Sequence, residues 1–223
     1  DDSRALIENY SRCDSRVKVI YQGNQGLTRA LITGCTAAQG KYIARHDVGD
    51  VSRPQRLALQ TAALDANVDV SFVSCWTEFW GPEWEYLYLV KGTGRTSIAS
   101  YILSEIERHG VIDGPTHHGS VMFRRDLYLR AGGYRAEFYY GQDWDLWYRL
   151  AELGKFQTIE KALYKARVLP NSISVMDKTR QKSISRLSLA ALQRRQKGTS
   201  EESVLNEASA IRPNRNDKPR SAP

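Results

Sequence analysis

Two aspartates on either side of a turn are the first residues whose types and spacing suggest chemistry. Asp47 and Asp50 are separated by Val48 and Gly49 and follow a short strand predicted over 41–45. Two carboxylates three positions apart on a turn can converge on a hard cation, and Mg²⁺ typically takes one or two carboxylates together with substrate phosphates. Turn-forming Asp and Gly explain the same string without a metal, so both interpretations stay open.

A second acidic group, Gln142-Asp143-Trp144-Asp145, opens a helix predicted over 143–153. A carboxylate at a helix start is favoured by the helix dipole, so Asp143 is explained by capping alone. An acid beside tryptophans is also a candidate general base, provided that it reaches the proton it abstracts and has a suitable pKa. Spacing does not decide between these two roles.

The elements that must position these acids alternate along the first third of the chain. Periodicity and turn residues predict helices over 3–11, 27–38 and about 54–65, interleaved with strands over 16–21, 41–45 and 68–73. This order is typical of an α/β fold with a Rossmann-like, mostly parallel sheet flanked by helices, where ligands bind beyond the carboxyl ends of the strands. Because such a sheet needs a strand before its first crossover helix, we expect the fold to be N-terminally incomplete.

The remaining chain is less regular. The pattern predicts helices over 97–108, 126–131, 143–153 and 178–196, strands over 118–124, 156–159 and 163–168, and disorder beyond Gly198. Trp76, Trp80 and Trp84 recur at a helical spacing of four, which favours core or rim packing over an exposed ligand-binding platform. We expect two regions, a domain over 1–176 and a basic helix with a disordered tail over 177–223.

Composition excludes several classes of protein. Of 223 residues, 41% are hydrophobic and 26% are charged, which argues against a wholly disordered chain. The longest apolar run, residues 86–90, is far too short to span a membrane. The three cysteines, Cys13, Cys35 and Cys75, form no C-x-x-C pair, so neither a disulfide framework nor a zinc site is indicated. A cytoplasmic protein is expected.

The net charge of +7 belongs to the C-terminal end. From residue 178 onward there are 11 Lys and Arg against 4 acids, which leaves residues 1–177 neutral. A neutral body argues against a nucleic-acid-binding domain. The basic end is explained by a solvated tail, and it also suits peripheral contact with the inner face of a membrane.

Five segments in order resemble the family-two glycosyltransferases, which have the GT-A fold. They are Asn24-Gln-Gly-Leu-Thr-Arg-Ala30, the stretch 38–56 that contains His46-Asp-Val-Gly-Asp50, His118-Gly-Ser-Val-Met-Phe-Arg-Arg125, Gly132-Gly-Tyr134 and Gln142-Asp-Trp-Asp-Leu-Trp-Tyr-Arg149. The resemblance covers roughly residues 1–174. It implies an inverting transferase, in which an acceptor hydroxyl attacks the anomeric carbon of a nucleotide-activated sugar.

The resemblance also assigns roles to residues. It implies that Asp47 and Asp50 hold Mg²⁺ or Mn²⁺ on the donor diphosphate, although Gly49 replaces an acid of the family's D-x-D-D signature. It places the catalytic base at Asp143. It further implies donor contacts at Asp2, Gly26, Arg29 and Arg45, and contacts with a carbohydrate or lipid-linked acceptor at His118, Gln142 and Trp144. The family's opening strand-helix-strand would precede Asp1.

Other functions remain as alternatives. A non-catalytic homologue that binds nucleotide sugars, or an inactive fragment, fits Gly49 and the short start. A scaffold that binds RNA or membrane through its tail fits the charge. A hydrolase triad of Ser120, His118 and Asp143 is disfavoured because the G-x-S-x-G elbow is missing. All four histidines, His46, His109, His117 and His118, are expected to be loop or core residues rather than ligands.

Overall fold

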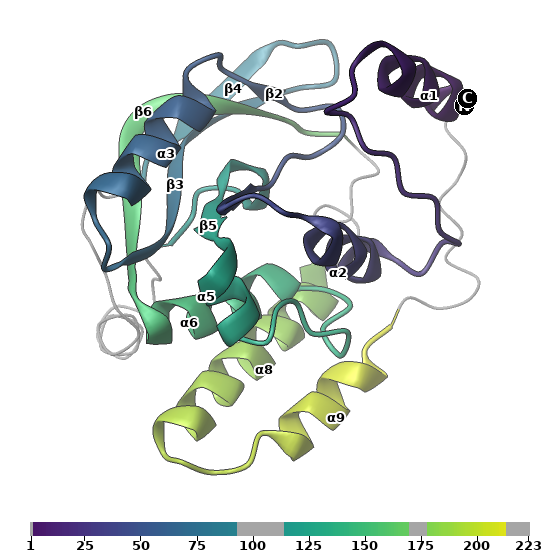
Figure 1. Cartoon of the computed structure of the whole chain (residues 1–223). Helices are drawn as coiled ribbons and strands as arrows, with labels where there is room; N and C mark the ends of the chain where they lie inside the picture. The colour runs from purple at the N-terminus through teal and green to yellow at the C-terminus, as the bar shows by residue number, and fades with distance from the viewer. Residues whose placement is uncertain (1, 93–113, 170–177, 213–223) are drawn as a thin grey trace.

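The computed structural model describes residues 2–92, 114–169 and 178–212, which form a curved sheet with helices on both faces (Figure 1). The strands are β1 (Tyr42–Ala44), β2 (Val51–Ser52), β3 (Val70–Trp80), β4 (Tyr86–Val90), β5 (Met122–Arg124) and β6 (Lys155–Arg167). The helices are α1 (Ser3–Cys13), α2 (Leu27–Ala37), α3 (Arg56–Ala66), α5 (Arg125–Arg130), α6 (Gln142–Leu153), α8 (Lys178–Gln196) and α9 (Glu202–Ala210), with a 3₁₀ turn, η1 (His118–Ser120), before β5.

The sheet is centred on β3 and β6, which run parallel to each other. Its order is β1-β5-β3-β6-β2, with β4 paired to β3. The pairs β1–β5, β3–β5, β3–β4 and β2–β6 are all antiparallel. The α/β class is as predicted, but among the described strands the sheet is not mostly parallel. Periodicity marks a strand without giving its direction, and the expected strand over 16–21 is an exposed segment without strand geometry.

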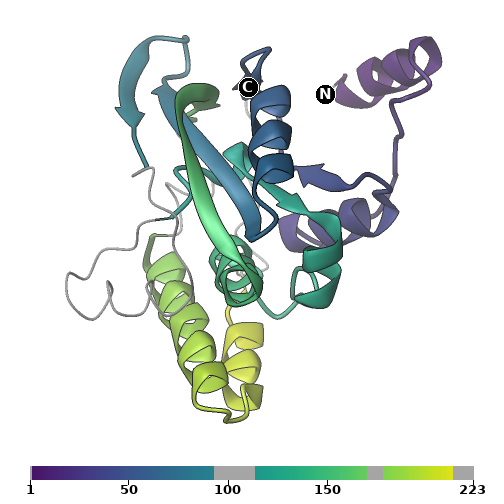
Figure 2. The same cartoon turned by 60° about the vertical axis from the view of Figure 1, so that its left-hand side comes forward.

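Strand β3 is buried on both faces, which explains its nearly continuous apolar sequence. Successive side chains point to opposite sides of a strand, so Phe72 packs with Leu146 of α6, while Val73 packs with Leu64 of α3. The two helices therefore cover opposite faces of β3 (Figure 2). This sandwich fixes α6, whose first turn carries the predicted base.

Helix α1 stands apart from the body (Figure 2) and has no buried residue. Its apolar side chains are exposed, with Leu6 at 58% and Tyr10 at 60% of their full accessibility. Helix α1 was predicted correctly from its periodicity, but among the described residues its apolar face has no core to pack on.

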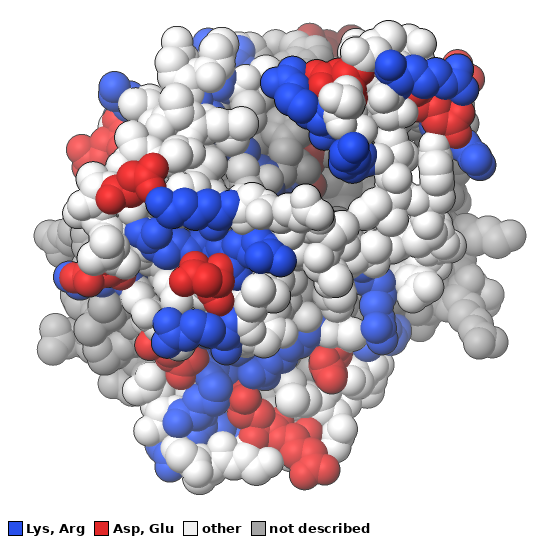
Figure 3. All heavy atoms as spheres, in the orientation of Figure 1, with Lys and Arg blue, Asp and Glu red and all other residues white. Residues whose placement is uncertain are grey.

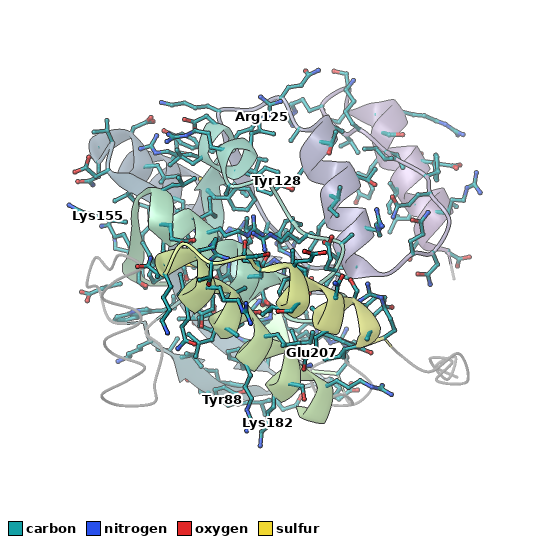
Figure 4. The ribbon with its side chains drawn as sticks, turned by 90° about the horizontal axis from the view of Figure 1, so that it is seen from below. Tyr88, Arg125, Tyr128, Lys155, Lys182 and Glu207 are labelled. Atoms are coloured by element: carbon teal, nitrogen blue, oxygen red, sulfur yellow. The ribbon has the colours of Figure 1, made fainter. Side chains whose placement is uncertain are left out.

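Helices α8 and α9 pack side by side against the end of the body that carries α6 (Figure 4). Their buried side chains form one cluster with the loop before α6, made of Phe138, Tyr140, Ile184, Leu187, Ala191, Val204 and Ala208. The basic helix over 178–196 is confirmed. The disorder expected beyond Gly198 is wrong for residues 202–210, because Val204 and Ala208 give α9 an apolar face that α8 and this loop bury.

Three other predictions differ in detail. The two strands expected over 156–159 and 163–168 are one continuous strand, β6, and the first three residues of the strand expected over 118–124 form η1. Trp76 and Trp80 lie on β3, so their spacing of four is not helical. The helix expected over 97–108 lies outside the described residues.

Candidate active site

Asp47, Asp50 and His117 form a cluster of possible metal ligands. One ligand atom from each residue lies within 4.8 Å of the other two. The two aspartates lie on the turn between β1 and β2, where the Asp50 amide donates to the Asp47 carbonyl at 3.3 Å. Gly49 has a φ of +86°, a left-handed conformation that glycine adopts without strain and that lets the chain reverse there.

The carboxylate of Asp50 is held by strand β6. Oδ2 accepts a hydrogen bond from the Tyr164 hydroxyl at 2.7 Å, and Oδ1 accepts one from the Arg167 amide at 2.9 Å. The same hydroxyl accepts a hydrogen bond from the Asp47 amide at 3.0 Å. Because β2 pairs with β6, the sheet itself fixes the turn against Tyr164.

His117, the residue directly before η1, is the third member of the cluster. Its ring stacks on Tyr164 with centroids 5.4 Å apart, and Nδ1 lies 4.0 Å from Asp50 Oδ2. Nδ1 accepts a hydrogen bond from the Gly119 amide at 3.0 Å. A metal ion bound at Nδ1 would replace this hydrogen bond. Burial lowers the pKa of His117 to about 4, so the imidazole is neutral near pH 7, as a metal ligand must be.

Sequence reasoning did not single out His117. It was expected to be a loop or core histidine, and the predicted acceptor contact was its neighbour His118. The available signal was its position directly before a strand that pairs beside β3, but no residue spacing links position 117 to position 50.

Arg45 connects the two acidic groups that the sequence pointed to. Its guanidinium is buried and forms an ion pair with Asp47. It also interacts electrostatically with Asp143 and Asp50. Its buried Nε has no hydrogen-bond partner within the described part of the chain. An unpaired buried donor beside carboxylates is suited to an anionic ligand such as a diphosphate.

Asp143 lies in the first turn of α6, directly after Gly141 and Gln142. Its Oδ1 accepts a hydrogen bond from the Trp144 amide at 3.0 Å. Burial raises the pKa of Asp143 above its usual value, and the Trp144 amide and the charge of Arg45 only partly offset this. A carboxyl whose pKa moves toward neutrality suits proton abstraction.

Asp145, two residues later, is structural. It is fully buried and accepts a hydrogen bond from Arg149 NH2 at 2.5 Å, and Arg149 NH1 donates to the Gly133 carbonyl at 2.7 Å. Of the two acids in the first turn of α6, Asp143 is therefore the one left for chemistry.

The predicted acceptor residues lie around Asp143. Gln142 is buried at the start of α6, and Trp144 packs edge-on against Trp147 with centroids 4.9 Å apart. The half-buried His118 shares a hydrogen bond of 2.8 Å between its Nε2 and the Tyr134 hydroxyl, and desolvation lowers its pKa well below the usual value. Its neutral ring lies edge-on to Trp147 of α6, with centroids 6.0 Å apart. Its acceptor contact remains a prediction.

The other predicted donor residues lie on the N-terminal elements. Asp2 precedes α1 and Arg29 lies on α2, and both side chains are exposed. Helix α1 stands apart from the body (Figure 2), and the donor contact of Asp2 stays a prediction. Gly26 is the N-cap of α2, with a φ of +86°, and packs against the ring of Tyr139.

We expect Gly26→Ala to lower the free energy of unfolding by about 1–3 kcal/mol. A Cβ there would lie 2.5 Å from Tyr139 Cε2, and the backbone would be strained. Urea denaturation measures the change. The matched control is Gly23→Ala, where a Cβ meets nothing within 4 Å, with an expected change within about 0.5 kcal/mol. Equal losses in both variants would contradict the packing role.

A comparison with protein families shows where the chain belongs. Residues 1–129 match the model of "Glycosyl transferase family 2". The chain belongs to this family. The matched residues include the Asp47–Asp50 turn and η1, whereas α6 and the C-terminal helices follow the match.

Relatives and solved structures agree with this membership. EpsE of Bacillus subtilis, assigned as a glycosyltransferase, is 30% identical over 180 residues, which cover 75% of this chain and 58% of EpsE. The UDP-Gal:alpha-D-GlcNAc-diphosphoundecaprenol beta-1,3-galactosyltransferase of Escherichia coli is 27% identical over 148 residues, which cover 64% of this chain and 49% of that enzyme. This family member thus spans about half the length of the curated relatives it matches.

The mannosyltransferase PcManGT from Pyrobaculum calidifontis, solved with GDP-Man and Mn²⁺, superposes with a TM-score of 0.58. It is 15% identical and the match covers 94% of this chain and 56% of PcManGT. This likeness confirms the GT-A fold.

Charge and hydropathy bear on the predicted membrane contact. None of the helices in the described ranges is long and apolar enough to cross a membrane. On the face shown in Figure 3, Lys and Arg side chains lie beside Asp and Glu side chains rather than forming one basic surface. Peripheral contact through the basic C-terminal region remains a prediction.

Proposed function

We propose that the chain transfers a sugar, with inversion, from a nucleoside diphosphate sugar to an acceptor hydroxyl, with a divalent ion held by Asp47, Asp50 and His117. The observation that carries the proposal is that Asp47, Asp50 and His117 bring their ligand atoms within 4.8 Å of one another beside the buried guanidinium of Arg45, which pairs with Asp47. Family membership and the donor and Mn²⁺ bound to PcManGT support the same chemistry.

The side chains of Asp47, Asp50 and His117 suit a divalent metal as ligands. Carboxylate oxygens suit both Mg²⁺ and Mn²⁺, whereas an imidazole nitrogen is better tolerated by Mn²⁺. His117 is neutral and Asp50 is oriented by Tyr164 and Arg167, so two of the three ligands are prepared in advance. A bound ion supplies charge that stabilises the departing diphosphate. Arg45 adds a fixed positive charge on the same side of the site.

Asp143 completes the proposal as the base. Inversion needs one group that removes the proton of the acceptor hydroxyl as that oxygen attacks the anomeric carbon. Burial raises the pKa of Asp143, which suits the carboxyl to this step, and the charge of Arg45 lowers that pKa in part. The partly buried Trp144 lies beside Asp143 in the chain, and its ring packs against the buried Tyr148 with centroids 5.8 Å apart. A carbohydrate or lipid-linked acceptor, as named for the Escherichia coli relative, fits this position.

The proposal is tested by thermal shift with UDP- and GDP-sugars, each with and without Mn²⁺. A matching donor at about 100 times its dissociation constant should raise the melting temperature by roughly 5 °C or more, and only with Mn²⁺ present. The matching nucleoside monophosphate is the control, because it lacks the diphosphate. No Mn²⁺-dependent shift with any donor would contradict a metal-dependent donor site.

Release of nucleoside diphosphate then separates the enzyme from a non-catalytic homologue that only binds donor. We expect slow, Mn²⁺-dependent hydrolysis of the matching donor when acceptor is absent. Binding without any release of nucleoside diphosphate, with or without acceptor glycosides, would favour the non-catalytic alternative.

A further inference from the structure

Helix α8 runs alongside α6 over the whole length of α6. Ile184 of α8 packs on Gly141, the residue that caps the start of α6. Arg195 of α8 donates to Glu152, near the end of α6, at 2.7 Å. Eleven residues separate the two contacts on each helix, so α6 and α8 are parallel and in register.

The contact at Gly141 leaves no free space. Gly141 has a φ of +61°, and a Cβ at this position would overlap the side chain of Ile184. The preceding loop is held from two sides, because Phe138 and Tyr140 pack with α8 and α9 while the Thr28 hydroxyl of α2 donates to the Phe138 carbonyl at 2.8 Å. The backbone that leads into Asp143 is therefore clamped between α2 and α8.

A series of ion pairs links α6 to the loop before it and to the turn between α8 and α9. Asp145 faces Arg135 at 3.7 Å, and Arg135 donates to both oxygens of Glu201, at 3.0 and 3.1 Å. Glu201 also accepts a hydrogen bond from Arg195 at 2.5 Å, and Arg195 returns to α6 at Glu152. These five residues form a ring of charges: Asp145, Arg135, Glu201, Arg195 and Glu152. The ring begins and ends on α6 and passes through Glu201, in the turn between α8 and α9.

Glu201 is the centre of this ring. Burial alone would raise its pKa, but the hydrogen bond from Arg135 and the charges of Arg195 and Arg135 lower it below the usual value, so the carboxylate is ionised. Its side chain is 17% exposed, and those of Arg135 and Arg195 are 19% and 18% exposed. Ion pairs this buried add little net stability but can select one arrangement of the groups that they join.

We propose that Glu201 is a positioning residue that, with the α8–α9 pair, holds the first turn of α6 and so aims Asp143. The inference rests on the proposed function for the role of Asp143. Residues 130–212, which supply the ring, lie outside the family match over 1–129. Small displacements of a catalytic group can cost about 100-fold in rate, so a clamp on the backbone is of direct use to the base.

The test compares Glu201→Gln with Glu207→Gln in the full chain. Gln keeps the size of Glu201 and removes its charge. Glu207 lies on α9, the helix that Glu201 caps, and its side chain is exposed (Figure 4). Hydrogen–deuterium exchange reads the amides of residues 145–147, the first of which donates to the Gly141 carbonyl. We expect Glu201→Gln to speed their exchange about tenfold, with the amides of β3 unchanged, and Glu207→Gln to change neither.

The kinetic measurement uses the donor found by the thermal-shift screen. Glu201→Gln should lower kcat about tenfold at unchanged donor KM, because the base is displaced while the diphosphate site is intact. In a double-mutant cycle, Glu201→Gln and Arg135→Gln together should cost less than the sum of the two single losses, since both substitutions break the Arg135–Glu201 contact.

The outcomes separate the two proposals. Faster exchange confined to residues 145–147 supports the positioning role even if Asp143 proves not to be the base. Unchanged exchange at these amides in Glu201→Gln would overturn the inference. Equal acceleration in β3 would also overturn it, because Glu201 would then only stabilise the whole fold. An additive double mutant would show that Arg135 and Glu201 do not act through each other.

Discussion

Asp143→Asn should lower the turnover number by about 10²–10⁴-fold while leaving donor affinity nearly unchanged. Asn keeps the oxygen that accepts the Trp144 amide, so the start of α6 is preserved and only the ability to take a proton is lost. Steady-state kinetics of nucleoside diphosphate release, together with donor titration, give the two numbers. Turnover equal to the unmodified chain would show that the base lies elsewhere.

The same substitution has a second, opposite effect. Burial raises the pKa of Asp143 in the folded chain above its unfolded value, so the ionised carboxylate destabilises the fold at any pH above the folded pKa. Removing that charge should leave the melting temperature at neutral pH equal or higher. The control is Asp145→Asn, which breaks a fully buried ion pair with Arg149 and should cost roughly 3–5 kcal/mol.

The pKa of Asp143 also sets the sign of the pH dependence. A base must be ionised to act, so kcat/KM should fall as pH decreases through the raised pKa of Asp143. The groups that interact with Asp143 are Arg45, which lowers its pKa, and Tyr134 and Tyr148, which are neutral in this range because burial raises their own pKa values. Loss of the acid limb in Asp143→Asn would support the assignment.

His117→Ala should weaken Mn²⁺ binding in the presence of the matching nucleoside diphosphate by about tenfold or more, and Asp47→Asn should do the same. Each removes one of three groups whose ligand atoms lie within 4.8 Å of one another. Electron paramagnetic resonance of free Mn²⁺ gives the dissociation constant directly.

The matched control for these variants is His46→Ala. His46 lies next to Asp47, but its Nδ1 is 3.2 Å from the Ser52 hydroxyl and it is not part of the cluster. We expect its loss to leave Mn²⁺ affinity within about twofold. If His117→Ala and His46→Ala bind Mn²⁺ alike, His117 is not a ligand and the site consists of carboxylates alone.

The sequence was most informative where chemistry follows directly from chain position. Asp47 and Asp50 follow a strand, and Asp143 opens a helix with a strong apolar stripe, so local pattern marked all three as candidates and the resemblance supplied their predicted roles. His117 could not be found this way, because its ring is brought to Asp50 by stacking on Tyr164, a residue 47 positions further along the chain. The ion pair of Arg45 with Asp47 likewise depends on the tertiary structure, although the resemblance predicted Arg45 as a contact of the nucleotide sugar.

The fold was predicted less well where periodicity is ambiguous. The segment over 16–21 alternates like a strand but does not pair with a strand among the described residues. The alternating pattern alone therefore predicted a strand that does not form. Residues 202–210 looked too polar to fold, yet the two buried positions Val204 and Ala208 suffice because α8 supplies the rest of the cluster. Strand direction depends on connections across the whole chain, which is why a mostly parallel sheet was expected from local order.

The most direct test is anomalous diffraction at the manganese absorption edge, from crystals of this chain grown with Mn²⁺ and the matching nucleoside diphosphate. We expect one strong peak bound by Asp47, Asp50 and His117, with the diphosphate between that peak and Arg45 and with the Asp143 carboxylate on the open side of the same site. A peak held by other residues, or a nucleotide bound away from Arg45 and Asp143, would contradict it.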